Sequence, residues 1–403
     1  MPDYDIITIG GGIGGSSLAK VMAERGYKVL VGERETQFKD RVRGEWIAPW
    51  GVAEARTLGL FDTLMAAGGY QPDMMTTFAG PAPLPPRNPA ETTPQGEQQL
   101  TMYHPKMQEA LLDAAERAGA EVRRGARVRN AAPGSEPSVE IEWDGGSETK
   151  TARLVVACDG RNSVARKWGG FQSHQVPAGN LVGGVLVEGM PDDGSSSVLV
   201  FNPVFGQCAL YFPQGPGHGR AYFGNRLDSG LRLQGDADMP RFIEEAIRTG
   251  YPADRLAGMK QAGPLATFEG LDDFVDHPYR DGIALVGDAA ATTDQTWGQG
   301  LSLTLRDARG LWDELLATDD WDAAGHAYAE KHDSYYQALR EAEHWLTTVM
   351  MDRSESANAI RMRVLPQIMT NPDILPDTVV SGPEFAPVTD YQRQLLIGDA
   401  AVA

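Results

Sequence analysis

Apolar and polar positions over the first 35 residues follow the order strand, turn, helix, strand. Residues 5–9 are a short apolar run of the kind found in buried strands, and residues 16–25 have the composition of a helix. A glycine at position 26 ends this helix, and residues 28–31 form a second apolar run. The pattern predicts a βαβ unit at the start of a parallel α/β domain.

The rest of the chain contains two kinds of sequence pattern, one typical of an α/β domain and one typical of an antiparallel sheet. Helical spacing recurs at residues 106–118, 301–316 and 323–350, residues 139–143 alternate before an Asp-Gly-Gly hairpin turn, and residues 154–157 and 283–286 are short apolar runs expected as buried strands. Residues 79–98 are rich in Pro and Gly and predict an irregular excursion. Between residues 178 and 268, short apolar runs separated by Gly/Pro turns predict an antiparallel sheet inserted into the α/β domain.

The net charge of the chain argues against two classes of binding partner. The chain has 403 residues, of which 55 are acidic and 36 basic, and its formal net charge is −19. Because the phosphates of nucleic acids and anionic membranes bind Lys and Arg, we expect neither partner. No apolar run reaches the ~18 residues of a membrane-spanning helix, so we expect no membrane span.

The two cysteines and the N-terminus indicate the compartment. Cys158 and Cys208 each lie in an apolar stretch and are expected to be reduced core thiols. The first residues lack the basic and apolar regions of a secretory signal. We therefore expect a cytoplasmic monomer or homodimer whose partner is a small-molecule substrate.

A glycine-rich turn follows the first predicted strand and opens the first helix. Gly10, Gly12 and Gly15 satisfy G-x-G-x-x-G, in which glycine permits a tight turn, close approach of a pyrophosphate and close helix–strand packing. The helix N-terminus offers unpaired N–H groups to phosphates. Glu33 ends the second strand, where a carboxylate accepts hydrogen bonds from ribose hydroxyls. Together these features predict a dinucleotide site.

Two further motifs follow predicted strands. Asp159-Gly160 follows residues 154–157, and Gly287-Asp288 follows residues 283–286, with Gly298-Gln-Gly300-Leu-Ser downstream. Either dipeptide alone is an ordinary turn. Their order behind the glycine motif resembles that of the single-component flavoprotein monooxygenases with the p-hydroxybenzoate hydroxylase fold, and the resemblance covers nearly the whole chain.

The resemblance implies a fold and a domain division. The fold is α/β, with a Rossmann-like FAD-binding domain and an interleaved antiparallel-sheet substrate domain. We assign residues 1–72, 100–177 and 269–403, including the C-terminal helices, to the FAD-binding domain. Residues 73–99 and 178–268 then form the substrate-binding sheet domain.

The same resemblance implies roles for matching positions. Glu33 would hold the adenosine ribose, and Asp288 and Gln108 the ribityl chain. Arg43, with Arg41 as its rival, would lie near the flavin, and the segment from Gly298 would bring helix N–H groups to it. The positions assigned to FAD are Gly10, Gly12, Ile13, Gly14, Gly15, Glu33, Arg34, Arg43, Gln108, Asp159, Gly160, Gly287, Asp288, Gly298, Gly300, Leu301 and Ser302.

The implied reaction uses three small molecules besides the substrate. In the family, NADPH or NADH reduces FAD transiently, and O₂ is the co-substrate that forms a flavin C4a-hydroperoxide. The implied enzyme is an FAD-dependent oxidoreductase that hydroxylates or epoxidises a small aromatic or electron-rich compound. Such chemistry needs a site that excludes water and holds the substrate close to the flavin.

The substrate side departs from the family pattern. Ala291, Gln295 and Ser302 stand where the family often has His, Pro and Asn, and His104 replaces the usual Arg opening the middle helix. Candidates for lining the substrate pocket are Tyr211, Pro213, Tyr222, Gln295, Thr296 and Trp297, with Phe212 beside them. Arg226, His344 and Asp294 are candidates for orienting or deprotonating a substrate, whereas His218 lies in a turn. We predict no metal site and name no catalytic acid or base.

Three alternatives stay open. A flavin-dependent halogenase would need a lysine in a tunnel and a W-x-W-x-I-P segment, and residues 45–50 match this segment only superficially. An isoprenoid-type reductase would turn over without consuming O₂. A non-enzymatic FAD-binding partner protein would bind FAD but form neither oxygenated product nor peroxide.

Overall fold

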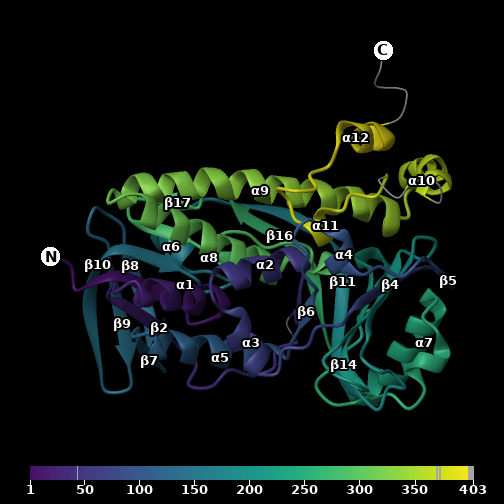
Figure 1. Ribbon diagram of the computed structural model, residues 1–403, viewed down its shortest axis with the longest axis horizontal. Helices are drawn as coiled ribbons and strands as arrows, with labels where there is room; N and C mark the ends of the chain where they lie inside the picture. Colours follow the sequence, from purple (N-terminus) through teal and green to yellow (C-terminus); the bar gives the residue numbers. More distant parts are fainter. Residues whose placement is uncertain (43, 369–370, 372–373, 398–403) are drawn as a thin grey trace.

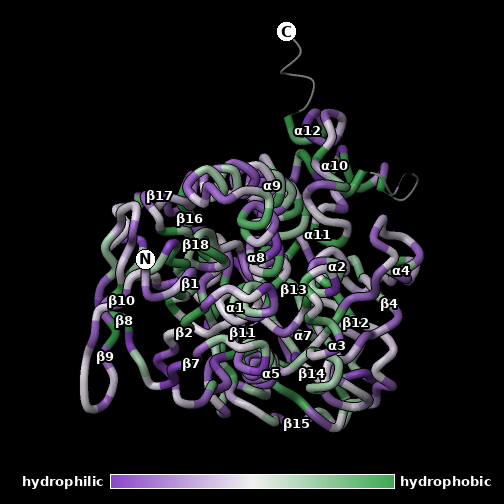
Figure 2. The backbone as a smooth tube through the Cα atoms, turned by 60° about the vertical axis from the view of Figure 1, so that its left-hand side comes forward, coloured by the Kyte–Doolittle hydropathy of each residue, from purple (hydrophilic) through white to green (hydrophobic). Residues whose placement is uncertain are grey.

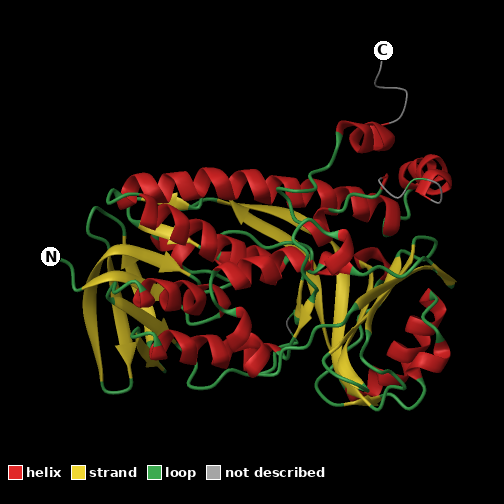
Figure 3. Ribbon diagram, in the orientation of Figure 1, coloured by secondary structure: helices red, strands yellow, loops and turns green. Residues whose placement is uncertain are grey.

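Two large β-sheets lie side by side, with one long helix running over both (Figure 1). The computed structural model describes residues 1–42, 44–368, 371 and 374–397. The first sheet and its helices lie on the left of Figure 3, and the second sheet lies on the right.

The first sheet has a parallel core in the order β18-β10-β1-β2-β7. Its strands are β1 (Tyr4–Ile9), β2 (Val29–Glu33), β7 (Glu121–Arg124), β8 (Arg127–Ala132), β9 (Ser138–Trp143), β10 (Gly146–Ala157), β17 (Tyr279–Arg280) and β18 (Ile283–Leu285). The hairpin predicted at residues 139–146 and the buried strand predicted at 154–157 share the single strand β10, which pairs with β9 first and with β1 afterwards. The strands that carry the three sequence motifs are therefore neighbours.

The second sheet is largely antiparallel, in the order β15-β11-β14-β13-β12-β4-β5, with β16 also pairing with β11. Its strands are β4 (Met74–Ala79), β5 (Ala82–Pro83), β11 (Ser173–Glu188), β12 (Ser196–Asn202), β13 (Gln207–Pro213), β14 (His218–Arg226), β15 (Lys260–Gln261) and β16 (Ala266–Val275). A two-stranded ladder of β3 (Trp46–Ile47) and β6 (Leu100–Thr101) lies apart from both large sheets. The second sheet thus takes strands from residues 74–83 and 173–275, a wider span than the predicted 178–268, and the domain division stays a prediction.

Helices pack against both sheets. They are α1 (Ile13–Glu24), α2 (Pro49–Thr57), α3 (Phe61–Ala66), α4 (Pro89–Thr92), α5 (His104–Arg117), α6 (Ala165–Trp168), α7 (Met239–Thr249), α8 (Gly300–Ala317), α9 (Trp321–Met350), α10 (Glu355–Ile368), α11 (Thr378–Ser381) and α12 (Asp390–Ile397), with short 3₁₀ turns η1 (Leu227–Ser229), η2 (Asp236–Asp238), η3 (Ala253–Leu256), η4 (Gly287–Ala289) and η5 (Gln295–Trp297). Helix α7 covers the outer face of the second sheet, and α9 crosses above both sheets (Figure 1). Among the helices described, none is both long and apolar enough to span a membrane.

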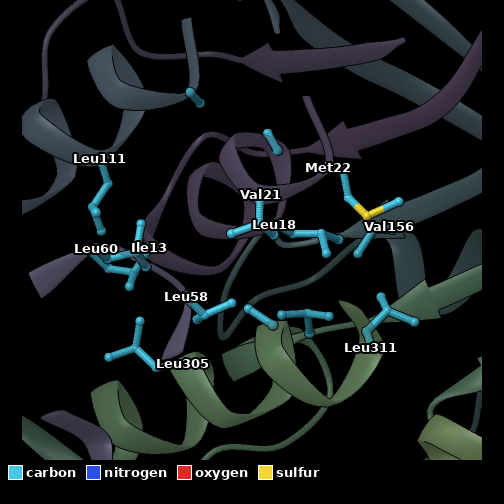
Figure 4. Close-up of a cluster of buried hydrophobic side chains, with 14 of the residues drawn as sticks. Ile13, Leu18, Val21, Met22, Leu58, Leu60, Leu111, Val156, Leu305 and Leu311 are labelled. Atoms are coloured by element: carbon cyan, nitrogen blue, oxygen red, sulfur yellow. The ribbon is translucent and has the colours of Figure 1, made fainter. Parts of the chain in front are cut away.

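Apolar burial explains this arrangement. In Figure 2 the interior strand β18 is hydrophobic and the edge strand β7 is hydrophilic, as expected for a sheet whose interior strands are covered on both faces. Figure 4 shows Leu18, Val21 and Met22 of α1 against Val156 of β10 and Leu311 of α8. Burying such side chains contributes about 1.5–3 kcal/mol each. The core therefore holds α1, β10 and α8, which carry the motifs, in one rigid unit.

Candidate functional site

The glycine-rich turn is shaped by packing at three of its positions. An added Cβ at Gly10, where φ is +101°, would lie 2.6 Å from the carbonyl oxygen of Cys158. At Gly15 it would lie 2.1 Å from the carbonyl oxygen of Gly10, and at Gly14 it would lie 2.9 Å from Val286. These glycines allow β1 and α1 to approach β10 and β18 closely.

Gly12 has a different environment. It is the N-cap of α1 and makes no side-chain hydrogen bond to the first turn, and its φ of −71° suits any residue. An added Cβ there would meet only the Gln108 amide nitrogen, at 3.8 Å. The space beside Gly12 and Gln108 at a helix N-terminus fits the pyrophosphate of a dinucleotide.

The end of β2 brings the predicted ribose ligand to this turn. Glu33 is 5% exposed, and its carboxylate accepts hydrogen bonds from the backbone N–H groups of Gly11 (2.7 Å) and Glu35 (2.8 Å). A carboxylate so held keeps further lone pairs for ribose hydroxyls. The Arg34 side chain is exposed, beside Glu35, and Arg43 lies outside the described residues.

The Asp159-Gly160 turn leads into α6 and touches the other motifs. One oxygen of Asp159 accepts from the N–H groups of Val164 (2.9 Å) and Ala165 (3.3 Å), whereas the other is buried without a partner. Gly160 has a φ of +82°. The unpaired oxygen is free to accept a hydrogen bond from a bound ligand.

Arg166 joins the second motif to the third, which the sequence analysis did not anticipate. The Arg166 side chain donates to the carbonyl oxygens of Ala289 (2.7 Å) and Asp288 (2.9 Å) and pairs with Asp273 at 2.7 Å. It is 6% exposed. These bonds go to backbone carbonyl oxygens. They hold the Gly287-Asp288 turn in place without using the Asp288 carboxylate.

Asp288 is the residue to which the resemblance assigns the ribityl chain. It is half-buried, and its carboxylate accepts no hydrogen bond from the described residues. One of its oxygens would lie 3.8 Å from a Cβ added to Gly300, the first residue of α8. A free carboxylate beside a helix N-terminus suits the hydroxyl groups of a ribityl chain.

Asp307 is a second supporting residue that the sequence analysis did not assign. It is fully buried, and its carboxylate accepts from the N–H of Gly287 (2.7 Å) and the hydroxyl of Tyr335 (2.5 Å). Burial raises the pKa of the Asp307 carboxyl, and His332, 4.0 Å away, opposes this shift. Asp307 thereby fixes the third motif to α8 and α9.

The segment before α8 closes the predicted flavin site. Gly298 has a φ of +68°, and a Cβ there would lie 2.9 Å from the Trp46 ring. Leu301 is 9% exposed. The Ser302 hydroxyl accepts a hydrogen bond from the N–H of Ala48 (3.0 Å), which directs this side chain towards the residues before α2. The helix N-terminus at Gly300 remains a favourable place for the anionic edge of a reduced flavin.

The inner face of the second sheet presents aromatic side chains to this segment. Phe212 stacks on Trp46 with ring centroids 5.6 Å apart, and Phe201 stacks on Trp297 at 5.5 Å. Tyr222 contacts Phe212 edge-on at 6.0 Å. Burial raises the pKa of the Tyr222 hydroxyl well above its usual range, so this phenol is neutral at physiological pH. The face is an apolar, aromatic wall suited to a planar organic molecule.

The structure does not bring all predicted pocket residues to this wall. Tyr211 is 2% exposed and packs on the opposite face of β13, in the core beneath α7. Because side chains alternate along a strand, Leu210 and Phe212 face inward and Tyr211 faces outward. The Pro213 carbonyl accepts from the Thr101 hydroxyl.

Residues 294–297 connect the second sheet to the predicted flavin site. Asn180 of β11 donates to Asp294 (2.7 Å) and Thr296 (3.2 Å), and the Trp297 indole donates to Thr347 of α9 (2.9 Å). The Gln295 amide lies against the guanidinium of Arg161, beside the second motif. This segment touches elements from both sheets.

Other charged candidates lie in several places. Arg226 donates to the Asn180 side chain at 3.0 Å and so reaches Asp294 indirectly. His218 and His344 are exposed.

The structure also bears on the cysteines and on metal binding. Burial raises the pKa of the Cys208 thiol to about 12. No cluster of metal-ligating side chains occurs in the part of the chain that the structure describes.

A buried ion pair next to the aromatic wall escaped the sequence analysis. Arg220 is fully buried and donates to Glu45 (2.7 and 2.9 Å) and Asp40 (3.0 Å). Glu45 also accepts from the Gln214 amide and from the N–H of His104. Burial raises the pKa of Glu45, although Arg220 acts in the opposite direction. The pair ties β14 to the segment that follows β2.

The sequence is similar to those of known proteins. The FAD binding domain family matches residues 3–354. A 3-(3-hydroxy-phenyl)propionate/3-hydroxycinnamic acid hydroxylase from Mycolicibacterium gilvum is 24% identical over 430 aligned positions, covering 100% of this chain and 69% of that protein. Digeranylgeranylglycerophospholipid reductase 1 from Methanopyrus kandleri is 26% identical, covering 80% of this chain and 84% of that protein.

Solved structures agree on the fold. The p-nitrophenol 4-monooxygenase PnpA from Pseudomonas putida DLL-E4 superimposes with a TM-score of 0.76 at 18% identity, covering 98% of each chain. The flavin-dependent brominase Bmp2 gives a TM-score of 0.76 at 15% identity, covering 99% of this chain and 98% of that one. These likenesses and the family match confirm the predicted fold. The chain therefore belongs to the FAD binding domain family and is an FAD-dependent oxidoreductase.

Proposed function

We propose that the protein is an NAD(P)H-using FAD monooxygenase that inserts one oxygen atom of O₂ into a small aromatic or electron-rich substrate. The observation that carries the proposal is the aromatic wall, in which Phe212 of the second sheet stacks on Trp46 and Phe201 stacks on Trp297 of the segment before α8. An apolar wall excludes water and holds a planar substrate by stacking. Bound FAD would supply the redox and oxygen chemistry.

The protein's own groups would position the cofactor and substrate. Gly12 and the N-terminus of α1 would receive the pyrophosphate, Glu33 the adenosine ribose, and Asp288 the ribityl chain. Asp307 and Arg166 would hold the Gly-Asp turn in place. The Tyr222 hydroxyl is neutral and is therefore a poor base at physiological pH.

An isoprenoid reductase is the second candidate, because a digeranylgeranylglycerophospholipid reductase aligns with most of the chain. It would use the same FAD site and turn over without O₂. A halogenase is disfavoured by the lysines, since seven of the eight lie at exposed or half-exposed positions. The eighth, Lys20, donates to the carbonyl oxygens of Leu58 and Gly59 on α1's side of the first sheet.

The test starts from purified protein loaded with FAD. We expect the oxidised flavin spectrum to bleach anaerobically with NADH or NADPH, and O₂ uptake to rise with one member of a panel of phenols and other aromatic compounds. Mass spectrometry should then find one added oxygen atom in that compound. Failure of both nicotinamide cofactors to reduce the flavin would refute the monooxygenase proposal. Saturation of an isoprenoid without O₂ uptake would establish the reductase instead.

A further inference from the structure

One face of α9 follows residues 292–297, the segment next to the predicted flavin site. Tyr336 donates to the carbonyl oxygen of Thr292 at 2.9 Å, and Thr347 accepts from the Trp297 indole at 2.9 Å. Glu343 lies between these two contacts at helical spacing, so it faces the same segment. Its neighbours there are the Thr293 hydroxyl and the N–H of Asp294.

Glu343 is buried without a cationic partner or a well-formed hydrogen bond. It is 4% exposed, and neither carboxyl oxygen has a hydrogen bond of good geometry within the described residues. The Thr293 side chain and the Asp294 N–H are near enough to lower its pKa, but burial and the neighbouring carboxylates have the larger, opposite effect. The groups that face it are mostly negative: Asp272 of β16 and Asp294 both raise its pKa. The neighbouring cation, Arg340, lies 3.8 Å from Asp272, and Asp294 already accepts from Asn180 and from the Thr296 N–H.

The remaining charged groups nearby do not neutralise it either. Asp273 of β16 pairs with Arg166 at 2.7 Å, and Tyr336 is itself held neutral, because burial raises the pKa of its hydroxyl. An ionised Glu343 would be a third carboxylate beside Asp272 and Asp294, and Arg340 already pairs with Asp272. Since an unpaired charge in a protein interior is very costly, the closed arrangement requires the neutral acid.

The titration of the cluster agrees with this geometry. Burial, followed by the charges of Asp272 and Asp294, raises the pKa of the Glu343 carboxyl well above its ordinary value. Burial and Asp294 raise the pKa of Asp272 to about 6. A group whose pKa is higher in the folded state loses stabilisation as the pH rises above the pKa of the unfolded chain.

We propose that Glu343 is a positioning residue which, as a neutral acid, keeps residues 292–297 against α9 in the conformation that binds FAD, so that its ionisation weakens FAD binding. The inference rests on the FAD site of the proposed function and adds a proton-dependent control of that site. Rising pH favours conformations in which Glu343 is ionised and the 292–297 segment has moved away from α9. Falling pH restores the arrangement described above.

The test compares Glu343→Gln with wild type and with Glu330→Gln, an identical chemical change at an exposed position of the same helix. FAD affinity is measured by flavin fluorescence quenching, and thermal unfolding of the apo-protein by calorimetry. Between about pH 6 and about pH 8.5 we expect wild type and Glu330→Gln to lose affinity about threefold to thirtyfold. Glu343→Gln cannot ionise at this position, so its affinity should fall clearly less than that of wild type, and only by the part that comes from the titration of Asp272. Its apo-protein should unfold at a higher temperature than wild type at the higher pH.

The outcomes separate this inference from the proposed function. An equal pH-dependent loss in Glu343→Gln and wild type overturns the inference, as does a folded Glu343→Gln protein that fails to bind FAD at the lower pH. Unfolding of Glu343→Gln also overturns it, because the amide keeps the shape of the neutral acid. If wild type binds no FAD, the proposed function fails, and the unfolding temperatures of the apo-proteins still decide whether Glu343 is held neutral.

Discussion

Gly12→Ala separates cofactor binding from folding within the glycine-rich turn. The added methyl group would meet only the Gln108 amide nitrogen, at 3.8 Å, which is an ordinary contact. The φ of −71° suits alanine. Alanine is a poorer N-cap than glycine, at a cost of about 0.5–1 kcal/mol, but it reduces the entropy of the unfolded chain by a similar amount. The free energy of unfolding of the apo-protein should therefore barely change.

FAD affinity should respond differently. If the pyrophosphate approaches the backbone at Gly12, a methyl group there forces the ligand or the turn to shift. Overpacking of this kind costs about 1–3 kcal/mol, which corresponds to a roughly fivefold to 150-fold loss of affinity. Isothermal titration of the apo-protein with FAD measures this loss directly.

Gly15→Ala is the matched control, with the same chemical change three residues later. Its Cβ would lie 2.1 Å from the carbonyl oxygen of Gly10, so β1 and α1 cannot keep their places. We expect this variant to be largely unfolded by circular dichroism. Wild-type FAD affinity in Gly12→Ala, or a markedly lower unfolding temperature of its apo-protein, would refute the assignment of Gly12 to the pyrophosphate.

Three other substitutions test the supporting groups. Asp288→Ala should leave the unfolding temperature of the apo-protein unchanged, because no described residue forms a hydrogen bond with the Asp288 carboxylate. The same variant should bind FAD more weakly in the titration described above. Unchanged FAD affinity would exclude a role of Asp288 in binding the ribityl chain. Asp307→Asn weakens the acceptor of the Gly287 N–H and should cost about 1.5–3 kcal/mol in urea denaturation, whereas wild-type stability would show that this bond contributes little. Glu45→Gln removes the main charge partner of buried Arg220, and we expect a loss of about 3–5 kcal/mol by the same method. A loss below about 1 kcal/mol would indicate that Asp40 alone neutralises Arg220.

Local features were predictable because they depend on neighbouring residues. The strand, glycine turn and helix at the start of the chain follow from apolar spacing and from backbone freedom at Gly10. The structure places the predicted helices close to their expected ranges, and α9 starts at Trp321 rather than at residue 323. The roles assigned to individual FAD residues stay predictions.

Strand faces were harder to predict. The apolar run of β13 is buried on both sides, so its sequence does not indicate which alternate residues face the site. Tyr211 therefore looked as suitable as Phe212, and only the packing of α7 against the outer face shows that Tyr211 lies on the side of the sheet opposite the aromatic wall. The long strand β16 pairs with β11 across an irregular register, which short-range patterns do not reveal.

The sequence by itself determined the dinucleotide-binding unit, the order of its three motifs and the acidic charge that argues against polyanionic partners. These properties depend on residues close together in the chain or on composition alone. Tertiary structure decided which polar groups meet inside the protein. Glu45 and Arg220 are 175 positions apart, and Gly287 and Asp307 lie on different elements. Buried charges must find partners in space, and only the packed fold determines which partners are within reach, as for Arg220, or absent, as for Glu343.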